Sequence, residues 1–144
     1  MFSKGCEYGI KAVVYIATQS LEGKRSKIGD VADNSGSPLA FTAKILGTLS
    51  KHNIVNSHTG PLGGFYIDSK QMYEINMSDI VRAIDGDSIY NGCGLGLKEC
   101  NDKEPCPMHY KFVKVRNEMK EMLLSTSIHD LAVGFKSGKT VLKR

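Results

Sequence analysis

The chain has 144 residues, of which 41% are hydrophobic, and its formal net charge is +4 at pH 7. A chain of this length can bury one sizeable core, and it has no apolar run long enough to span a membrane. Its first residues lack the apolar segment of a secretory signal, so we expect a cytoplasmic protein. The basic excess is mild and uneven, because an acidic middle, residues 71–100, separates two basic ends.

The N-terminal third of the chain predicts three helices. Apolar residues at spacings of three and four predict an amphipathic helix over residues 8–21. Ser26 is expected to cap a second helix over residues 27–34, and Ser37 a third that begins with a proline and runs to about residue 51. Two short helices joined by a tight glycine-containing turn are typical of a helix-turn-helix, a motif that many helical domains share.

A hairpin is predicted directly after these helices. Ile54-Val55 and residues 65–67 are rich in β-branched and aromatic side chains, as short strands are. A glycine-rich tip lies between them, which makes this hairpin the wing of a winged helix. Ser78 is then expected to cap a short helix that ends at Gly86.

The third helix and the wing are the predicted DNA-binding surface. Small residues on an outward helix face let its backbone approach DNA, while lysines beside them reach phosphates or base edges. The alternatives are an ordinary solvated face and an ordinary flexible hairpin. The residues expected to contact DNA are Lys27, Pro38, Ala40, Phe41, Ala43, Lys44, Gly47, Thr48 and Lys51 from the helices, and His58, Thr59, Gly60, Pro61, Leu62 and Gly63 from the wing.

Residues 87–106, here called the cysteine loop, show neither helical nor strand periodicity and contain Cys93, Cys100 and Cys106. Three thiols so close together in a reducing cytosol favour a metal or redox site over structural disulfides. Thiolates in a glycine- and proline-rich loop favour an iron–sulfur cluster, with a fourth ligand that is not cysteine. Zinc bound by three cysteines and a histidine, or a reversible disulfide, are the alternatives. Cys6 stands alone and is expected to be a buried free thiol.

A long helix is predicted over residues 107–125. Its apolar residues follow the spacing of a coiled-coil seam over about two heptads, which predicts a homodimer through this helix. The residues of this seam are Met108, Phe112, Val115, Met119 and Met122.

Several segments carry a family resemblance that covers nearly the whole chain. They are Ser3-Lys4-Gly5-Cys6-Glu7-Tyr8, residues 28–37, Gly60-Pro61-Leu62-Gly63-Gly64-Phe65-Tyr66, residues 79–86 and Cys106-Pro107-Met108-His109. In these segments the chain resembles the Rrf-type winged-helix repressors, whose iron–sulfur members include IscR and NsrR. The glycine-rich wing followed by Asp-Ile-Val-Arg-Ala-Ile is quite specific to this family.

The resemblance implies a winged helix-turn-helix, a long C-terminal helix that pairs two subunits, and a cluster on the three cysteines. In IscR-like members a histidine three residues after the last cysteine completes the site, and His109 matches it. In NsrR-like members an acidic residue from the partner's first helix does so, and Glu7 lies at about that position. The first cysteine gap is one residue longer than in IscR, and Ala43 replaces a glutamate that contacts bases there. These departures leave the operator and the cluster type open.

The resulting prediction is a mainly α fold with a small β-hairpin wing. Residues 1–86 would form the DNA-binding domain, residues 87–106 the cysteine loop, and residues 107–144 the dimerisation helix and a C-terminal tail. The function would be that of a repressor that binds a pseudo-palindromic double-stranded DNA operator under the control of an iron–sulfur cluster. Two irons are favoured over four. The alternative is a small metal- or cluster-binding redox protein that does not bind DNA. No enzyme is predicted, because no catalytic motif is recognisable.

Overall fold

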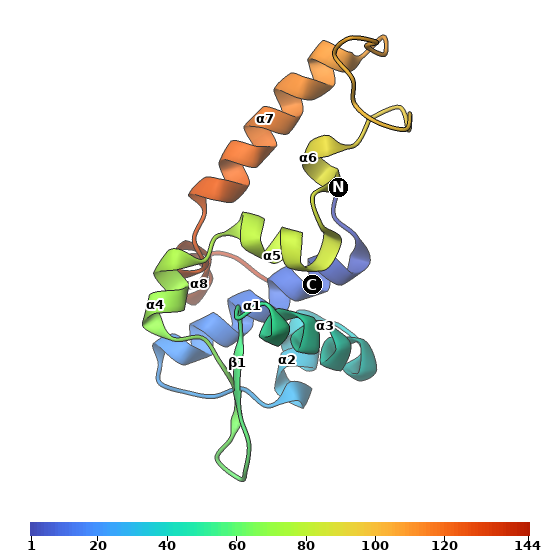
Figure 1. Cartoon of the computed structure of the whole chain (residues 1–144). Helices are drawn as coiled ribbons and strands as arrows, with labels where there is room; N and C mark the ends of the chain where they lie inside the picture. Colours follow the sequence, from blue (N-terminus) through green and yellow to red (C-terminus); the bar gives the residue numbers. More distant parts are fainter.

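A computed structural model describes the whole chain, Met1 to Arg144, as helices with one two-stranded antiparallel hairpin (Figure 1). The predicted mainly α fold with a small wing is therefore confirmed. No helix is both long and apolar enough to cross a membrane. The elements are α1 Lys4–Leu21, α2 Ile28–Ser35, α3 Leu39–Lys51, β1 Asn56–His58, β2 Gly64–Tyr66, α4 Ser69–Glu74, α5 Met77–Asp85, α6 Ser88–Asn91, α7 His109–Ser125 and α8 Ile128–Lys136.

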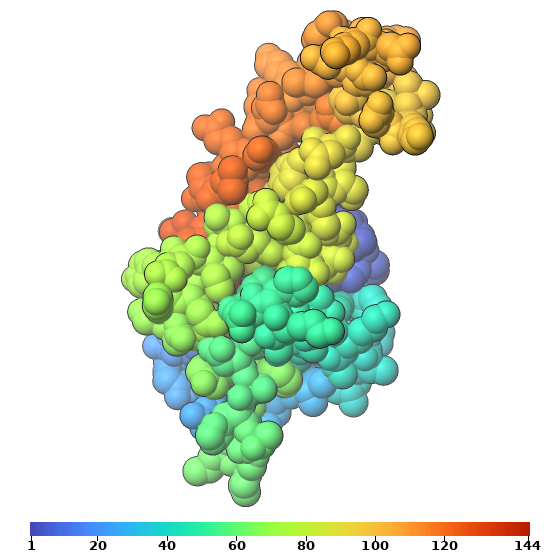
Figure 2. Space-filling view, in the orientation of Figure 1, coloured from blue at the N-terminus to red at the C-terminus, as the bar shows by residue number.

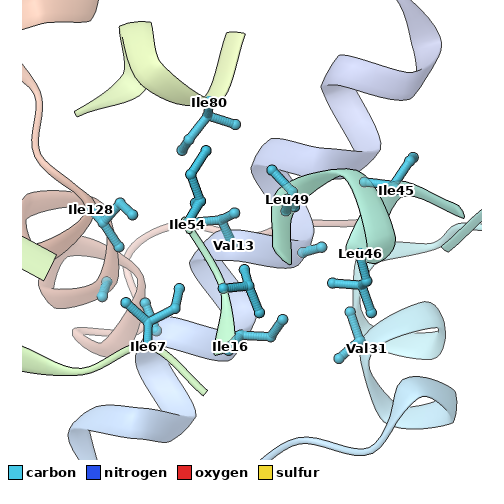
Figure 3. Close-up of a cluster of buried hydrophobic side chains, with 14 of the residues drawn as sticks. Val13, Ile16, Val31, Ile45, Leu46, Leu49, Ile54, Ile67, Ile80 and Ile128 are labelled. Atoms are coloured by element: carbon cyan, nitrogen blue, oxygen red, sulfur yellow. The ribbon is translucent and has the colours of Figure 1, made fainter. Parts of the chain in front are cut away.

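The overall shape is a body with two projections. The hairpin extends from one end of the body, and α7 with the cysteine loop rises from the other (Figures 1 and 2). α1 runs through the body and packs against α2, α3, α5 and α8. The core lies between these helices, where aliphatic side chains such as Val13, Ile16, Leu46 and Leu49 meet (Figure 3).

α1 begins four residues before the predicted start, because Ser3 caps it. The Ser3 hydroxyl accepts a hydrogen bond from the Cys6 N–H at 3.0 Å. Its side chain and N–H also donate to the carboxylate of Asp85, at the end of α5. The N-terminus is therefore fixed beside the segment that enters the cysteine loop.

The two serine caps predicted for α2 and α3 are wrong. Ser26 is buried and exchanges two backbone hydrogen bonds with Phe65, so it extends the wing sheet by one bridge and leaves Lys27 as the N-cap. Pro38 is the N-cap of α3, and the Ser37 hydroxyl instead bonds the hydroxyl of Thr42. In both cases the serine forms hydrogen bonds with another part of the chain and not with the N–H groups at the start of the helix.

The first strand of the wing begins later than predicted. Ile54 and Val55 are each 2% exposed and belong to the core, and β1 starts at Asn56. Its pairing with β2 places Asn56 opposite Tyr66 and His58 opposite Gly64. The pair Ile54-Val55 is apolar because it is buried below the wing, not because it forms part of it.

Further differences concern α5 and the start of the cysteine loop. Asn76, not Ser78, caps α5, through a capping box with Asp79. Ser78 is buried and accepts a hydrogen bond from the Tyr90 hydroxyl at 3.0 Å. Tyr90 belongs to α6, a short helix in a stretch that was predicted to have no regular structure.

The C-terminal segment contains α8 where a tail was predicted. Ser127 and Asp130 form a capping box at its start. Ile128 and Ala132 are fully buried in the core, and α8 packs against α1. The chain therefore returns after α7 to complete the body that carries the wing.

Candidate DNA-binding surface and cysteine loop

α3 presents the outward face that its sequence predicts. Thr42, Ile45, Leu46 and Leu49 are buried, so the opposite side faces solvent. The exposed residues of that side are Pro38, Ala40, Ala43, Lys44, Gly47 and Lys51, and Thr48 is half-buried. A Cβ placed on Gly47 would have no neighbour within 4 Å, so packing within the chain does not demand glycine there. Phe41 is half-buried and packs edge-on against Tyr8, with ring centroids 5.6 Å apart.

The wing tip is a tight turn with an exposed apolar residue. Leu62 is 86% exposed. Gly63 is buried and its N–H donates to the Gly60 carbonyl at 2.9 Å. A Cβ on Gly63 would lie 2.0 Å from the His58 carbonyl oxygen, so only glycine fits there. Gly63 is among the residues expected to contact DNA, but its N–H is bonded within the turn, so in this structure it shapes the turn and has no free N–H to donate.

Two cationic side chains donate hydrogen bonds to backbone carbonyls of the wing tip. Lys27 Nζ donates to the Pro61 carbonyl at 3.3 Å, and Arg25 Nη1 donates to the Leu62 carbonyl at 3.2 Å. Arg25 also lies over the Tyr66 ring, 5.4 Å from its centroid. Sequence reasoning included Lys27 but missed Arg25, although its basic neighbours are a signal that would have found it.

The cysteine loop places one of its three thiols against the start of α7. Cys100 Sγ lies 3.4 Å from His109 Nδ1, and His109 is only 6% exposed. Backbone N–H groups of Leu95 and Leu97 lower the pKa of the Cys93 thiol, with a smaller contribution from Cys106. No group of three His, Cys, Asp or Glu side chains is arranged to hold a metal ion.

This donor set suits an iron–sulfur cluster by its chemistry. Three half-buried free thiols and one buried imidazole are the soft and borderline ligands that iron–sulfur and zinc sites use. Arg116 Nη2 donates to Cys100 Sγ at 2.8 Å, which places a cation beside a thiol that would become an anion if it bound a metal. Glu7 pairs with Lys4 at 3.2 Å within its own chain. Cys6 is fully buried, as predicted, and burial raises its pKa to about 12.

The residues of the predicted seam on α7 lie in two different environments, some packed within the chain and others exposed to solvent. Met119 packs on the small cluster of Cys6, Val81 and Leu123, and Phe112 contacts Gly94 of the cysteine loop. The other members face solvent: Met108, Val115 and Met122 are 38%, 55% and 49% exposed. α7 therefore keeps an apolar face that this chain does not cover.

Comparison with known proteins decides the family. Residues 2–134 match the Rrf2 family, which is described as an iron-dependent transcriptional regulator. The chain belongs to the Rrf2 family. It is thus a DNA-binding winged-helix transcriptional regulator, and its homologues are regulators and not enzymes.

The relatives of this Rrf2 protein include regulators from several bacteria. It is 29% identical to an HTH-type transcriptional regulator of Aquifex aeolicus, over 91% of this chain and 90% of that one. It is 27% identical to IscR of Photorhabdus laumondii, over 90% of this chain and 76% of the relative.

Solved structures share the fold. CymR, the global cysteine regulator of B. subtilis, superposes with a TM-score of 0.77 at 22% identity, over 93% of this chain and 97% of CymR. IscR of T. potens gives 0.73 at 18% identity, over 98% and 92% of the two chains. At these identities the likeness concerns the fold.

Proposed function

We propose that this Rrf2 protein is a homodimeric repressor whose affinity for DNA is controlled by an iron–sulfur cluster. Cys93, Cys100 and Cys106 would be ligands, with His109 as the fourth. The observation that carries the proposal is the contact between Cys100 and His109, two donors of different type held together at the start of α7. IscR relatives with 26–29% identity support the same assignment.

The DNA-binding part of the proposal rests on α3 and the wing. Lys44 and Lys51 would reach phosphates or base edges, while the small residues beside them let the helix enter the major groove. Leu62 and the other exposed residues of the wing tip would meet the neighbouring groove. A two-fold dimer would place two copies of α3 about one DNA turn, ~34 Å, apart on a pseudo-palindrome.

The dimer would form through α7. Met108, Val115 and Met122, which recur every seven residues and so share one face of the helix, expose an apolar surface that a second copy of α7 would cover. The cysteine loop connects this helix to the body, because Tyr90 of α6 bonds Ser78 of α5 and His109 begins α7. A change in the arrangement of the loop would therefore tilt α7 against the DNA-binding body.

A bound cluster would link the thiols to one another. Oxidants, nitric oxide or iron shortage would remove the cluster and with it this link. Cys93 and Cys106 would have to close onto the pair of Cys100 and His109 to hold the cluster. That closure would shift the dimer between two geometries only if the cluster binds one of them more tightly. Two irons are favoured over four.

His109 is favoured over Glu7 as the fourth ligand. The imidazole is buried beside Cys100, whereas Glu7 forms an ion pair with Lys4 on α1. Glu7 would reach a cysteine loop only from the partner subunit.

A second candidate keeps the regulator and changes the signal. The pKa of the Cys93 thiol is lowered, in part by Cys106, and a more acidic thiol forms the reactive thiolate more readily, which supports a reversible disulfide between them in place of a cluster. CymR of Staphylococcus aureus, which shares the fold, has been solved in an oxidised form, and that likeness concerns the fold alone.

One experiment separates these functions. Protein purified without oxygen should be coloured, contain iron and sulfide, and bind an operator fragment with an affinity that changes when the iron is removed. One tight zinc without sulfide would make the loop a structural metal site. A metal-free protein whose DNA affinity follows oxidation of Cys93 and Cys106 would establish the thiol switch. Iron and sulfide without any DNA binding would leave a cluster-binding redox protein.

A further inference from the structure

A pocket of about 450 Å³ opens at the junction of α1, β2, α4 and α8. Figure 1 shows α4 and α8 side by side, across the body from α3. The floor of the pocket is apolar: it contains Leu21, Ile67 and Met72, and the last two are 2% and 3% exposed. Small-molecule sites typically have volumes of roughly 300–1,000 Å³ and mostly apolar walls. Neither the predicted DNA contacts nor the cysteine loop uses this pocket.

An aromatic pair forms one wall. Tyr73 of α4 and His129 of α8 stack with ring centroids 4.3 Å apart and planes 24° apart. The Tyr73 hydroxyl and His129 Nε2 lie 3.0 Å apart, so a hydrogen bond fixes the pair. Tyr73 is nevertheless 64% exposed. A large ring held rigidly in solvent offers a flat surface to a planar ligand.

Basic groups form the opposite rim. Lys24 pairs with Glu22 at 3.3 Å, whereas Arg25 has no carboxylate partner. The only carboxylate that lines the pocket, Asp68, caps α4 by accepting a hydrogen bond from the Gln71 N–H at 2.8 Å. The guanidinium of Arg25 therefore remains available to an anion, and its planar fork matches a carboxylate.

We propose that this pocket binds a small organic carboxylate with a planar apolar body. The carboxylate would bind Arg25, and the body would lie over Ile67 and Met72 beside the Tyr73 ring. This occupant follows from the lining: one cation without a carboxylate partner, an apolar floor and one fixed aromatic wall.

A ligand bound in the pocket would affect the position of the wing through Arg25. This guanidinium also donates to the Leu62 carbonyl at 3.2 Å, so a bound carboxylate competes with the wing tip for the same cation. A ligand that binds better when Leu62 is released shifts the wing away from its present position. This part of the inference rests on the proposed function, in which the wing contacts DNA.

The binding test uses benzoate, with neutral benzamide as its matched control, followed by backbone amide NMR on the protein without DNA. Benzoate should shift the resonances of Ile67, Met72 and His129 at millimolar concentration or below, and benzamide should bind at least fivefold more weakly. Arg25→Gln should reduce benzoate binding to the level of benzamide, and Arg144→Gln should not. Tyr73→Leu, at an exposed position, should also weaken it.

Equal binding of benzoate and benzamide, no shifts, or shifts scattered over the surface would overturn the site. The coupling is tested separately, by measuring operator affinity with and without saturating benzoate, and at least a threefold change is expected. Localised benzoate binding with unchanged operator affinity would overturn the coupling alone. Absence of operator binding under all conditions would instead count against the proposed function, because the NMR result does not depend on it.

Discussion

Arg116 of α7 binds the cysteine loop at two points, because its guanidinium donates to Cys100 Sγ at 2.8 Å and also to the Gly92 carbonyl. These contacts tie the loop to the helix that is proposed to pair two subunits. Cys100 also contacts His109 of the same helix. A cation next to a proposed ligand is expected to position its sulfur and to offset its charge once it binds iron.

Replacing Arg116 should therefore loosen the loop and weaken iron retention. In Arg116→Gln we expect faster amide hydrogen exchange over residues 92–100 of metal-free protein. In protein that carries iron we expect roughly 10–100-fold weaker retention against a chelator, the range typical for a lost partner of a metal ligand. Lys114→Gln, an exposed change on the same helix, is the control. Exchange and retention that match wild type would show that Arg116 does not position the loop.

Substitutions at Gly47 should affect the stability of the fold and the affinity for DNA in opposite directions. Because a Cβ at Gly47 meets nothing within 4 Å, Gly47→Ala should stabilise α3, by up to about 1 kcal/mol in the free energy of unfolding. If the α3 backbone approaches DNA there, the same change should weaken operator binding about tenfold, and Gly47→Leu should weaken it further. Gly134→Ala, in an equally open position on α8, should raise stability without affecting DNA binding. Unchanged affinity in Gly47→Leu would remove this face of α3 from the interface.

The dimer prediction concerns the exposed part of the seam. Val115→Asp with Met122→Asp should give monomers in sedimentation, because both side chains are about half exposed in one chain and would be buried by a second α7. Met119 is a poorer choice, since it packs within its own chain. Val141→Asp changes an exposed valine elsewhere and should leave the dimer intact. An intact dimer of the double variant would place the interface on another surface.

Cys6 should make stability depend on alkaline pH. Burial, with a smaller contribution from Asp85, raises its pKa in the folded state to about 12, from an ordinary value of 9.0. Between these values the folded state keeps a proton that the unfolded state has lost. The stabilisation is therefore complete below pH 9 and is lost as pH rises toward 12. Between pH 8 and pH 10 wild type should lose about 1 kcal/mol that Cys6→Ala does not lose. An equal change in the free energy of unfolding of wild type and Cys6→Ala between the two pH values would contradict this.

Sequence patterns predicted the order of the main elements but not their local ends. Ser26, Ser37 and Ser78 all stand near a helix start, and each has another partner that only the folded chain provides. The missed helices α4 and α8 carried a readable signal. Asp68 with Gln71, and Ser127 with Asp130, have the three-residue spacing of a capping box. Both helices are short, so their apolar periodicity alone was weak.

The candidate site was likewise predicted from the sequence only in part. The outward residues of α3 follow from helical periodicity, and the three cysteines follow from their spacing. The contacts of Arg25 with Leu62 and of Arg116 with Cys100 do not, because they join residues 37 and 16 positions apart in the chain. Likewise, the α7 pattern could not distinguish seam residues that pack within the chain, such as Met119, from those left exposed.

The fourth ligand of the proposed cluster can be assigned by two single variants. His109 is buried against Cys100, whereas Glu7 is bound to Lys4 on α1. We therefore expect His109→Ala to change the visible absorption spectrum of protein prepared without oxygen and to speed iron loss to a chelator, while Glu7→Gln leaves both unchanged. The conservative change Glu7→Gln removes the charge and keeps the shape, so an effect from it cannot be ascribed to lost packing. His129→Ala, outside the cysteine loop, controls for the loss of an imidazole.

Each of Cys93→Ala, Cys100→Ala and Cys106→Ala should abolish stable assembly, because two thiolates and one weaker ligand hold a cluster poorly. A changed spectrum in Glu7→Gln with none in His109→Ala would transfer the role to the partner subunit's first helix, and full iron and sulfide in all three cysteine variants would refute the cluster.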